Sequence, residues 1–319
     1  MTIQFDMFGD EALAPAGRTR PLADSPSEVG EDEMVRRLEM TGRYRVLQKL
    51  DPRPVAAMPK PGFPLRGVII DTETTGLSFR KNEVIEIGAV AFSFDAFGAI
   101  GDVIDVYGGL QQPREAIPAE ITRITGITDE MVAGQVIDWA RLEALVADAE
   151  LIVAHNAAFD RPFCEALSAA FADKAWACSV SEIDWSGRGF EGSKLGYLVG
   201  QAGLFHEGHR AVDDCFALLE VLDRKVRGET NSPFAELYTA SKQSRVRIFA
   251  ENSPYDSKDQ LKARGYRWSD GSDGRPKAWW TEVAESMLEE ELLWLRGEIY
   301  RYEATPLTRR LTAADRFKA

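Results

Sequence analysis

The chain has 319 residues, of which 45% are hydrophobic and 28% are charged, a composition typical of a globular protein with roughly two domains. No stretch approaches the roughly 18 consecutive apolar residues of a membrane-spanning helix, so the sequence predicts no such span. The net charge of −13 argues against non-specific binding to polyanions, because phosphate backbones attract Lys and Arg. A nucleic-acid ligand would therefore require local basic patches or bound cations.

The N-terminal stretch MTIQFDMFGDE is acidic and lacks the basic and apolar parts of a signal peptide, which predicts a cytoplasmic protein. The three cysteines are far apart in the sequence and form no CxxC pair. This spacing argues against a zinc site and against a disulfide framework. We expect all three to be buried thiols, namely Cys164, Cys178 and Cys215.

The first 64 residues are expected to contain little regular structure. Residues 1–30 are predicted to form a flexible tail, because residues 11–30 combine three prolines and two glycines without a hydrophobic period. In the extension 31–64, apolar residues at helical spacing predict two short amphipathic helices, one with Met34, Val35 and Leu38 and one with Tyr44, Leu47 and Leu50. Five prolines in 52–64 then favour a linker.

Strand-like and helix-like segments alternate over residues 65–226, which predicts an α/β domain of about 160 residues. The expected strands are 66–71, 84–93, 102–110 and 151–155, and the expected helices are 140–148, 157–171, 193–202 and 210–226.

A small α+β module is expected over residues 241–304. RVRIFA is predicted to be a strand, SKDQLKARGY a helix, and RWSDGSDGRPKAWW a hairpin around Gly271 and Gly274. An amphipathic helix is expected to follow the hairpin. Residues 305–319 are expected to be a tail.

The stretch GVIIDTETTG, residues 67–76, is an apolar strand that ends in two acids. Alternation along a strand places Asp71 and Glu73 on the same face, roughly 7 Å apart. Two like charges in one small site cost free energy unless a cation, a basic side chain or solvent neutralises them. Their position also favours a binding site, because open α/β sheets bind ligands at the carboxyl ends of their strands.

Two later junctions between an apolar segment and a helix also carry acids. LIVAHNAAFD places His155 and Asn156 at the end of a strand and Asp160 in the first turn of the next helix. EGHRAVDDCF places a histidine before a helix whose first turn contains two acids, Asp213 and Asp214. Each acid has an alternative explanation as a partner of the helix dipole.

The second of these helices has one face that can approach another element closely. Ala211 and Asp214 share that face, because they are three residues apart. Asp213 is turned about 100° away from it. Asp214 is therefore the better candidate for a shared site.

Carboxylates from the three junctions can converge on one site. Without an equivalent cluster of Lys or Arg, they would form a hard, oxygen-rich site suited to Mg²⁺ or Mn²⁺, with Asp71, Glu73, Asp160 and Asp214 as ligands. Two divalent ions would offset the four charges and would stabilise both the attacking and the leaving oxygen of a phosphoryl displacement.

A histidine near these carboxylates could accept a proton at neutral pH. Spacing does not choose between His155 and His209, since each precedes an acid by five residues. We favour His209, which follows Gly208 in a predicted loop and can move into hydrogen-bonding distance. His206 is most simply a surface residue.

The motifs DTETTG, HNAAFD and HRAVDD, in this order, resemble those of the DEDDh exonucleases, a family that includes the proofreading epsilon subunit of bacterial replicative DNA polymerase. The resemblance covers residues 65–226. It implies an RNase H-like fold, with a mixed five-stranded sheet flanked by helices, and a two-metal 3′-to-5′ exonuclease. By motif position it assigns the metals to Asp71, Glu73, Asp160 and Asp214, the general base to His209, and contacts with the terminal nucleotide to Thr74, Thr75 and Gly76. Asn156 of the second motif is a further expected substrate contact.

The sequence therefore predicts a metal-dependent DNA exonuclease that releases nucleoside 5′-monophosphates in replication proofreading or DNA repair. One alternative is an exoribonuclease of the same fold that trims RNA 3′ ends, because discrimination at the 2′-hydroxyl cannot be derived from the sequence. The other is a non-catalytic module that binds a clamp or a nucleic-acid strand. The complete set of five active-site residues argues against it, since a protein that had lost activity would tolerate their replacement.

Residues 4–8, QFDMF, are similar to the short peptides by which replication and repair proteins bind the bacterial sliding clamp. Gln4 and Asp6 would be the polar residues of such a peptide, and Met7 and Phe8 would fill an apolar groove on the partner. The following linker would act as a tether that raises the local concentration. The alternative is an N-terminus that is simply disordered.

Residues 241–280 contain nine Lys or Arg and five acids, a local charge of +4. Aromatic residues alternate with these charges, as they do in proteins that bind single strands. We expect Tyr266 and Arg267 to contact a nucleic-acid strand. For Trp279 and Trp280 a place in the core of the module is the favoured alternative.

Overall fold

The computed structural model describes residues 30–225, 228–272 and 274–318, and the chain divides into two compact units, Met1–Val46 and Leu47–Ala319. In the first unit, α1 spans Glu31–Met40, with three acids in its first turn and Arg37 in its last. These charges complement the helix dipole. The second helix expected between Tyr44 and Leu50 is wrong. Residues Gln48–Lys49 form β1 instead, whose backbone pairs with β7 (Leu204–Phe205).

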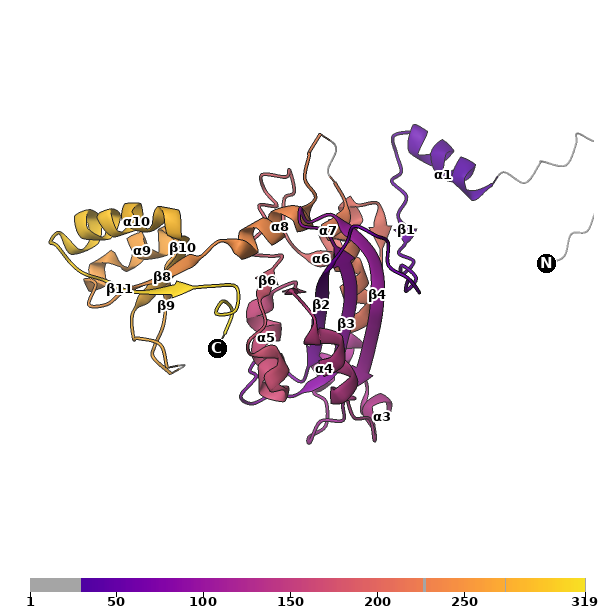
Figure 1. Cartoon of the computed structure of the whole chain (residues 1–319), viewed down its shortest axis with the longest axis horizontal. Helices are drawn as coiled ribbons and strands as arrows, with labels where there is room; N and C mark the ends of the chain where they lie inside the picture. Colours follow the sequence, from indigo (N-terminus) through magenta and orange to yellow (C-terminus); the bar gives the residue numbers. More distant parts are fainter. Residues whose placement is uncertain (1–29, 226–227, 273, 319) are drawn as a thin grey trace, which may run out of the picture. The chain divides into compact units, whose positions relative to one another are not determined.

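A mixed five-stranded sheet lies at the centre of the larger unit, in the order β4-β3-β2-β5-β6 (Figure 1). β3 is antiparallel to both β2 and β4, whereas β5 runs parallel to β2 and to β6. The five strands are β2 (Leu65–Thr74), β3 (Val84–Phe94), β4 (Ile100–Leu110), β5 (Leu151–Ala154) and β6 (Trp176–Cys178). The expected mixed sheet is thus confirmed.

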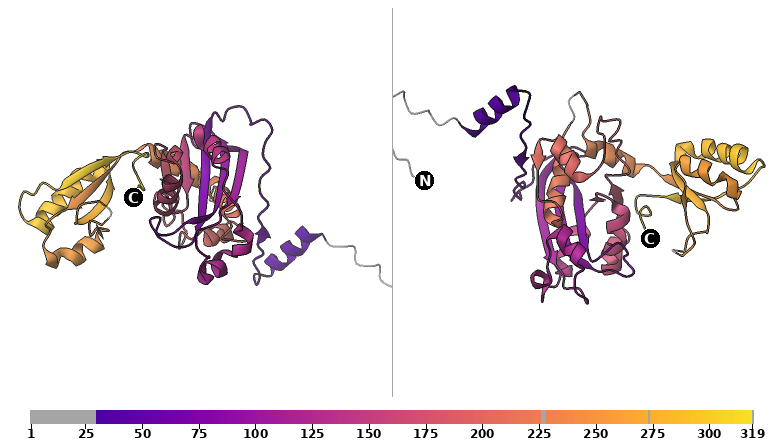
Figure 2. Two further views of the ribbon diagram at one scale, coloured as in Figure 1. Left: turned by 90° about the horizontal axis from the view of Figure 1, so that it is seen from below. Right: turned by 180° about the vertical axis from the view of Figure 1, so that it is seen from behind.

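Helices cover both faces of this sheet, as the two views of Figure 2 show. On one face, α4 (Trp139–Ala147) and α5 (Ala157–Leu167) pack against Val68 and Ile70 of β2. On the other face, three helices pack in the cluster that contains Ile69, namely α6 (Leu195–Gln201), α7 (Ala211–Asp223) and α8 (Pro233–Lys242). The alternation of side chains along β2 therefore decides which residues meet which helices.

The hydrophobic pattern did not predict α8 or the short elements. α8 follows a polar stretch, but its start carries a clear signal: Ser232 accepts a hydrogen bond from the Ala235 amide, and Pro233 occupies the first turn. Three other elements are too short to show a period: α2 (Ala119–Thr125), α3 (Asp129–Val132) and β6. The helix expected over 157–171 ends at Leu167, and Ala169–Phe171 forms a separate 3₁₀ turn.

Residues 245–311 form the small α+β module as a four-stranded antiparallel sheet in the order β11-β8-β10-β9. Its strands are β8 (Arg245–Ala250), β9 (Arg267–Trp268), β10 (Trp279–Ala284) and β11 (Leu307–Leu311). One face packs against α9 (Lys258–Ala263), α10 (Leu288–Trp294) and the following π-helical turn (Leu295–Tyr300). Two 3₁₀ turns, Tyr255–Ser257 and Glu285–Met287, lead into α9 and α10.

The expectation that residues 305–319 form a tail is wrong. β11 supplies the fourth strand of the module, and the residues after it pack against the domain of the five-stranded sheet. The Trp176 amide of β6 donates to the Ala313 carbonyl at 2.9 Å, and buried Arg161 donates to the carbonyls of Ala314 and Arg316, both at 2.7 Å. Arg316 is itself fully buried and pairs with Glu182. Residues 312–318 show no regular hydrophobic period, so the sequence pattern does not predict this packing.

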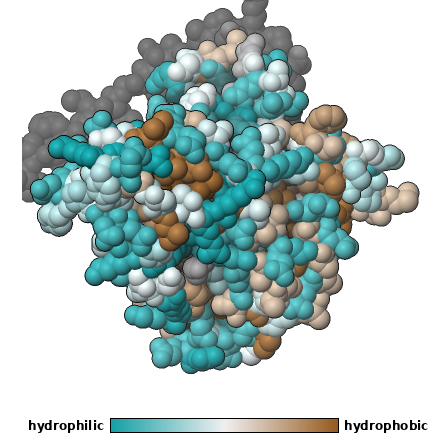
Figure 3. Space-filling view, turned by 60° about the vertical axis from the view of Figure 1, so that its left-hand side comes forward, coloured by the Kyte–Doolittle hydropathy of each residue, from teal (hydrophilic) through white to brown (hydrophobic). Residues whose placement is uncertain are grey.

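None of the helices in the described ranges is both long and apolar enough to cross a membrane. Hydrophilic side chains cover most of the face shown in Figure 3, with small hydrophobic patches between them.

Candidate active site

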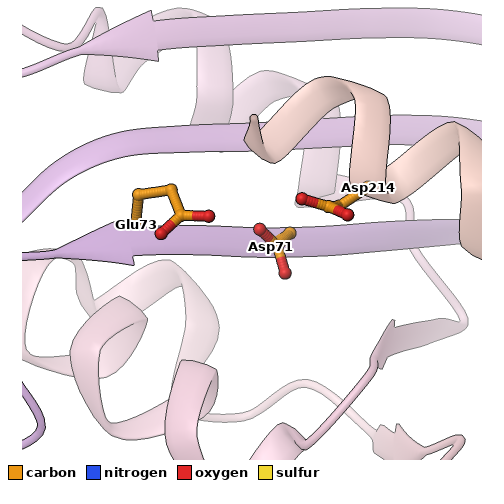
Figure 4. A group of neighbouring side chains, drawn as sticks. All are labelled: Asp71, Glu73 and Asp214. Atoms are coloured by element: carbon orange, nitrogen blue, oxygen red, sulfur yellow. The ribbon is translucent and has the colours of Figure 1, made fainter. Parts of the chain in front are cut away.

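Two of the three acidic junctions meet above β2, where Asp71 and Glu73 lie next to Asp214 (Figure 4). Asp71 and Glu73 follow Ile69 at steps of two residues, so all three side chains point to the face that α7 covers. One carboxylate oxygen from each of the three acids lies within 4.8 Å of the other two. The prediction that alternation places the first two acids on one face is therefore confirmed.

Close packing of α7 on the sheet positions Asp214. A Cβ on Gly88 of β3 would lie 2.4 Å from the backbone of Ala211, so only glycine permits this approach. Glu86 holds the start of the helix by accepting hydrogen bonds from the Ala211 amide at 3.0 Å and from the Arg210 guanidinium at 2.8 Å. The expectation that the face with Ala211 approaches another element is confirmed, and Asp214 lies one turn further along that face.

The three carboxylates repel one another in a half-buried site. Burial, followed by the charge of Asp160, raises the pKa of Asp71 well above its usual range. Burial, followed by the charge of Asp214, raises the pKa of Glu73 to about 8. A site of this kind favours protonation unless positive charge is supplied.

Asp160 lies near this group but does not belong to it. α5 packs on the opposite face of the sheet, where the side chain of Thr72 points. Oδ1 of Asp160 therefore accepts hydrogen bonds from the Thr72 amide at 3.1 Å and from its hydroxyl at 2.8 Å. Burial raises the pKa of Asp160 to about 7, against the opposing effect of these hydrogen bonds. The four predicted ligands thus form a group of three with the fourth held beside it.

The expectation that His206 is a surface residue is wrong. Its side chain is only 7% exposed, and its Nε2 lies 2.8 Å from Oδ1 of Asp214. The spacing of eight residues between the two is not a motif, so no signal in the sequence indicated this contact.

The two histidines considered as general bases occupy different settings. His155 is held on both ring nitrogens, by the Ser179 hydroxyl and by the Ser193 carbonyl, each at 2.7 Å. His209 has positive φ, at 66°, and its amide donates to Oδ2 of Asp214 at 2.7 Å. Its ring is 61% exposed, and Nδ1 lies 3.9 Å from Oε1 of Glu73. Only His209 thus presents an accessible ring beside the carboxylates.

A cavity of about 930 Å³ opens beside Asp214 and His209, a volume suited to a small organic ligand. Asn156, which has a left-handed backbone with φ of 107°, lies on its wall where β5 meets α5. Other lining residues are His155, Lys194, Tyr197, His209 and Asp214.

The remaining predicted substrate contacts fall into three groups. The Thr74 hydroxyl donates to the Gly76 carbonyl at 2.7 Å, and the Thr75 hydroxyl accepts from the Glu83 amide at 3.0 Å, so both are engaged within the loop that follows β2. Their role in substrate binding stays a prediction. Arg267 is exposed on the module. The expected peptide contacts lie outside the described residues, namely Gln4, Asp6, Met7 and Phe8.

The expectation that Tyr266 contacts a strand does not hold. Its ring is 3% exposed in the core of the module, and its hydroxyl lies 2.9 Å from Oε1 of Glu291. A tyrosine buried with its hydroxyl bonded to a partner is a common core arrangement, and the sequence alone does not distinguish it from a stacking surface.

The residues of this site fit divalent cations. The three neighbouring carboxylates offer hard oxygen ligands, and burial together with mutual repulsion makes their joint ionisation unfavourable without added positive charge. Arg210, whose positive charge acts on Glu73, is already paired with Glu86. Asp71, Glu73 and Asp214 could therefore hold a cation directly, with Asp160 beside them.

A five-stranded mixed sheet with acids gathered above its central strand is the arrangement of an RNase H-like nuclease domain. A family model described as Exonuclease (RNase_T) matches residues 68–222. DNA polymerase III subunit epsilon of Treponema pallidum is 34% identical over 167 residues, which cover 47% of this chain and 72% of that protein. The chain belongs to this exonuclease family.

Two further comparisons cover less of the proteins concerned. DNA polymerase III PolC-type of Clostridium perfringens is 34% identical over 165 residues, 49% of this chain, but the chain spans only 11% of that polymerase's length. Among solved structures, Exonuclease I in its apo form is 16% identical and aligns with 58% of this chain and 49% of its own, with a TM-score of 0.44.

Proposed function

We propose that this protein is a 3′-to-5′ exonuclease that removes nucleoside 5′-monophosphates from DNA ends and depends on two divalent cations, Mg²⁺ or Mn²⁺. The observation that carries the proposal is the group of three carboxylates, with oxygens within 4.8 Å of one another, beside the exposed ring of His209. The cavity next to them can accept the end of a strand.

The side chains have distinct roles in this proposal. Divalent cations, when bound, supply the positive charge that offsets the carboxylates and stabilises the charge developing on the phosphate. Asp71, Glu73 and Asp214 hold the cations, with Asp160 as the fourth carboxylate. His209 accepts the proton of the attacking water through its exposed ring, since a neutral imidazole can act as a general base. The contact of the His209 amide with Asp214 fixes the loop while its ring stays accessible.

DNA is the proposed substrate because the Treponema pallidum relative is named as a subunit of a DNA polymerase. The alternative substrate is RNA. Matched DNA and RNA strands, each with a free or a phosphate-blocked 3′ end, test both the substrate and the polarity. We expect mononucleotide release from DNA with a free 3′ end, and little release when that end is blocked. Faster release from RNA, or release from the 5′ end, would contradict the proposal.

The cellular role that we propose is replication proofreading or DNA repair in the cytoplasm, with the sliding clamp as a partner through residues 4–8. The sequence similarity of QFDMF to clamp-binding peptides supports this part. Binding of the purified bacterial clamp to the intact chain and to a Met7→Ala, Phe8→Ala double variant tests it. Equal binding by both proteins, or binding by neither, would contradict the proposed contact.

A further inference from the structure

The sheet of the C-terminal module has one face that its own helices leave uncovered. Val246, Ile248 and Ala250 of β8 point to the face packed by α9 and α10. Residues at the alternate positions, Arg247 and Phe249, point the other way. Register places Trp280 opposite both Phe249 and Arg267, and Glu282 opposite Arg247, so these side chains share the second face.

Arginines gather around one tryptophan on this second face. The guanidinium carbons of Arg267, Arg275 and Arg247 lie 4.2, 4.9 and 5.0 Å from the centre of the Trp280 ring. Trp280 is 7% exposed, so its ring is covered and does not offer a free surface for stacking. Packing against a tryptophan ring holds planar guanidinium groups in place, which reduces the entropy that they would lose on binding an anion.

The arginines of this face differ in their partners. Glu282 pairs with Arg247 at 2.6 Å, and Arg275 donates to the Lys318 carbonyl at 3.2 Å. Within the described ranges, Arg267 has no carboxylate within 4 Å, and it is exposed. Among the described residues, the cavity beside Trp280, of about 660 Å³, is lined by one acid, Glu282, and by six cationic side chains, Arg80, Arg245, Arg247, Arg267, Arg275 and Lys318.

This second cavity adjoins the one at the carboxylates. Asn156 and Val180 line both, so a ligand chain that leaves the active site past these residues enters the arginine-lined cavity. Arg80, from the loop after β2, donates to the Ser272 carbonyl at 3.1 Å on the same side. A string of phosphates is the ligand that extends between an acidic, cation-binding site and a cluster of guanidinium groups.

We infer that the arginines around Trp280 bind the phosphate backbone of a single nucleic-acid strand whose 3′ end lies at the carboxylates. This inference rests on the proposed function for the position of the strand end. A single strand is favoured over a duplex because the cavity has the volume of a small ligand and its cations surround it. The site would read no sequence, because phosphate contacts position a strand without identifying its bases.

The test measures binding in EDTA, so that no strand is cleaved. The full chain and Arg267→Glu are compared for binding of a fluorescent strand of about 12 nucleotides and of a dinucleotide. Lys262→Glu is the matched control, since it makes the same charge change on α9, which packs on the other face of the sheet. We expect Arg267→Glu to weaken binding of the longer strand about tenfold. The slope of the logarithm of the binding constant against the logarithm of the salt concentration should fall by about the value of one phosphate contact. Binding of the dinucleotide should not change, and Lys262→Glu should bind both ligands as the intact chain does.

Three results would overturn the inference: unchanged binding of the longer strand by Arg267→Glu, equal weakening by Lys262→Glu, or tighter binding of a duplex than of the single strand. Arg267→Ala serves as a second variant if Arg267→Glu does not fold, as judged by circular dichroism. If no nucleic acid is cleaved under any metal condition while Arg267→Glu still weakens strand binding selectively, the proposed exonuclease activity fails and the phosphate-binding site stands.

Discussion

Nε2 of His206 lies 2.8 Å from Oδ1 of Asp214, on the carboxylate whose other oxygen accepts the His209 amide. Asp214 is therefore held on both oxygens by the loop that precedes α7. In metal sites, neighbours of this kind orient the ligand and tune its affinity. In the proposed function the two histidines of this loop would thus have separable roles, His206 in positioning and His209 in proton transfer.

Replacing His206 should weaken cation binding more than it slows the saturated reaction. We expect His206→Ala to raise the Mn²⁺ concentration needed for half-maximal activity about 10–100-fold, because Asp214 loses an orienting partner. His209→Ala should instead lower kcat by about 10²–10⁴ with little change in that concentration. Mn²⁺ titrations of the initial rate measure both quantities. If both variants change the half-maximal Mn²⁺ concentration and kcat in the same way, the separate roles of His206 and His209 are contradicted.

Removing one carboxylate should stabilise the protein in the absence of cations. Asp71→Asn takes a charge out of a buried group in which neighbouring acids raise the pKa of this residue. We expect a higher Tm in EDTA at about pH 8 and loss of nuclease activity. Asp213→Asn is the control, because that side chain is outside the carboxylate group and should alter neither quantity. A lower Tm for Asp71→Asn would contradict the mutual repulsion inferred here.

The stability of the cation-free protein should fall as the pH rises from about 4.5 to about 8. Burial and the charge of Asp214 raise the pKa of Glu73 from its ordinary 4.5 to about 8. Between these values the folded protein keeps a proton that the unfolded chain has released, so the free energy of unfolding decreases with pH in that window. Thermal unfolding in EDTA at several pH values measures this, with Glu73→Gln as the comparison. If stability falls with pH equally steeply in Glu73→Gln, a group other than Glu73 is responsible.

Divalent cations should counteract the loss of stability that occurs as the pH rises. They bind the ionised carboxylates, so the increase in Tm caused by Mn²⁺ should be larger at about pH 8 than at about pH 6. Asp71→Asn should reduce the increase at both pH values. An increase that is independent of pH would indicate binding away from the carboxylates.

The buried pair of Arg316 and Glu182 should contribute strongly to stability. Both side chains are fully buried, and Arg316 also donates to the Ser241 carbonyl at 2.7 Å. We expect Arg316→Ala to lower the free energy of unfolding by about 3–5 kcal/mol, since it leaves Glu182 buried without its partner. Arg310→Ala, which removes an exposed pair with Glu285, should cost at most about 1 kcal/mol. Urea unfolding measures both, and equal effects would contradict the difference in burial.

Much of the central domain could be predicted from the sequence because its strands are long and apolar. β3 is buried along its whole length, and its hydrophobic run is visible in the sequence. The acids at the end of β2 could be assigned to one face because the period of a strand is two. β6 and α8 could not be predicted in the same way, since one has three residues and the other follows a polar stretch.

The contacts that sequence reasoning missed are those between residues far apart in the chain or without a period. His206 reaches Asp214 through the fold of a loop, and Arg316 reaches Glu182 across 134 positions. Tyr266 was assigned to a strand-binding surface because basic neighbours flank it, yet its ring turns inward to Glu291. The sequence shows that basic and aromatic side chains are neighbours along the chain, but only the strand register shows which of them share a face of the sheet.

The measurement that tests the central claim most directly is single-turnover degradation of a 3′-labelled DNA strand in Mg²⁺ or Mn²⁺ by the intact chain, Asp71→Ala and His209→Ala. The account predicts metal-dependent release of labelled mononucleotide by the intact chain, abolished in Asp71→Ala and slowed at least about 10²-fold in His209→Ala. Intact DNA under every metal condition, or equal cleavage by all three proteins, would contradict it.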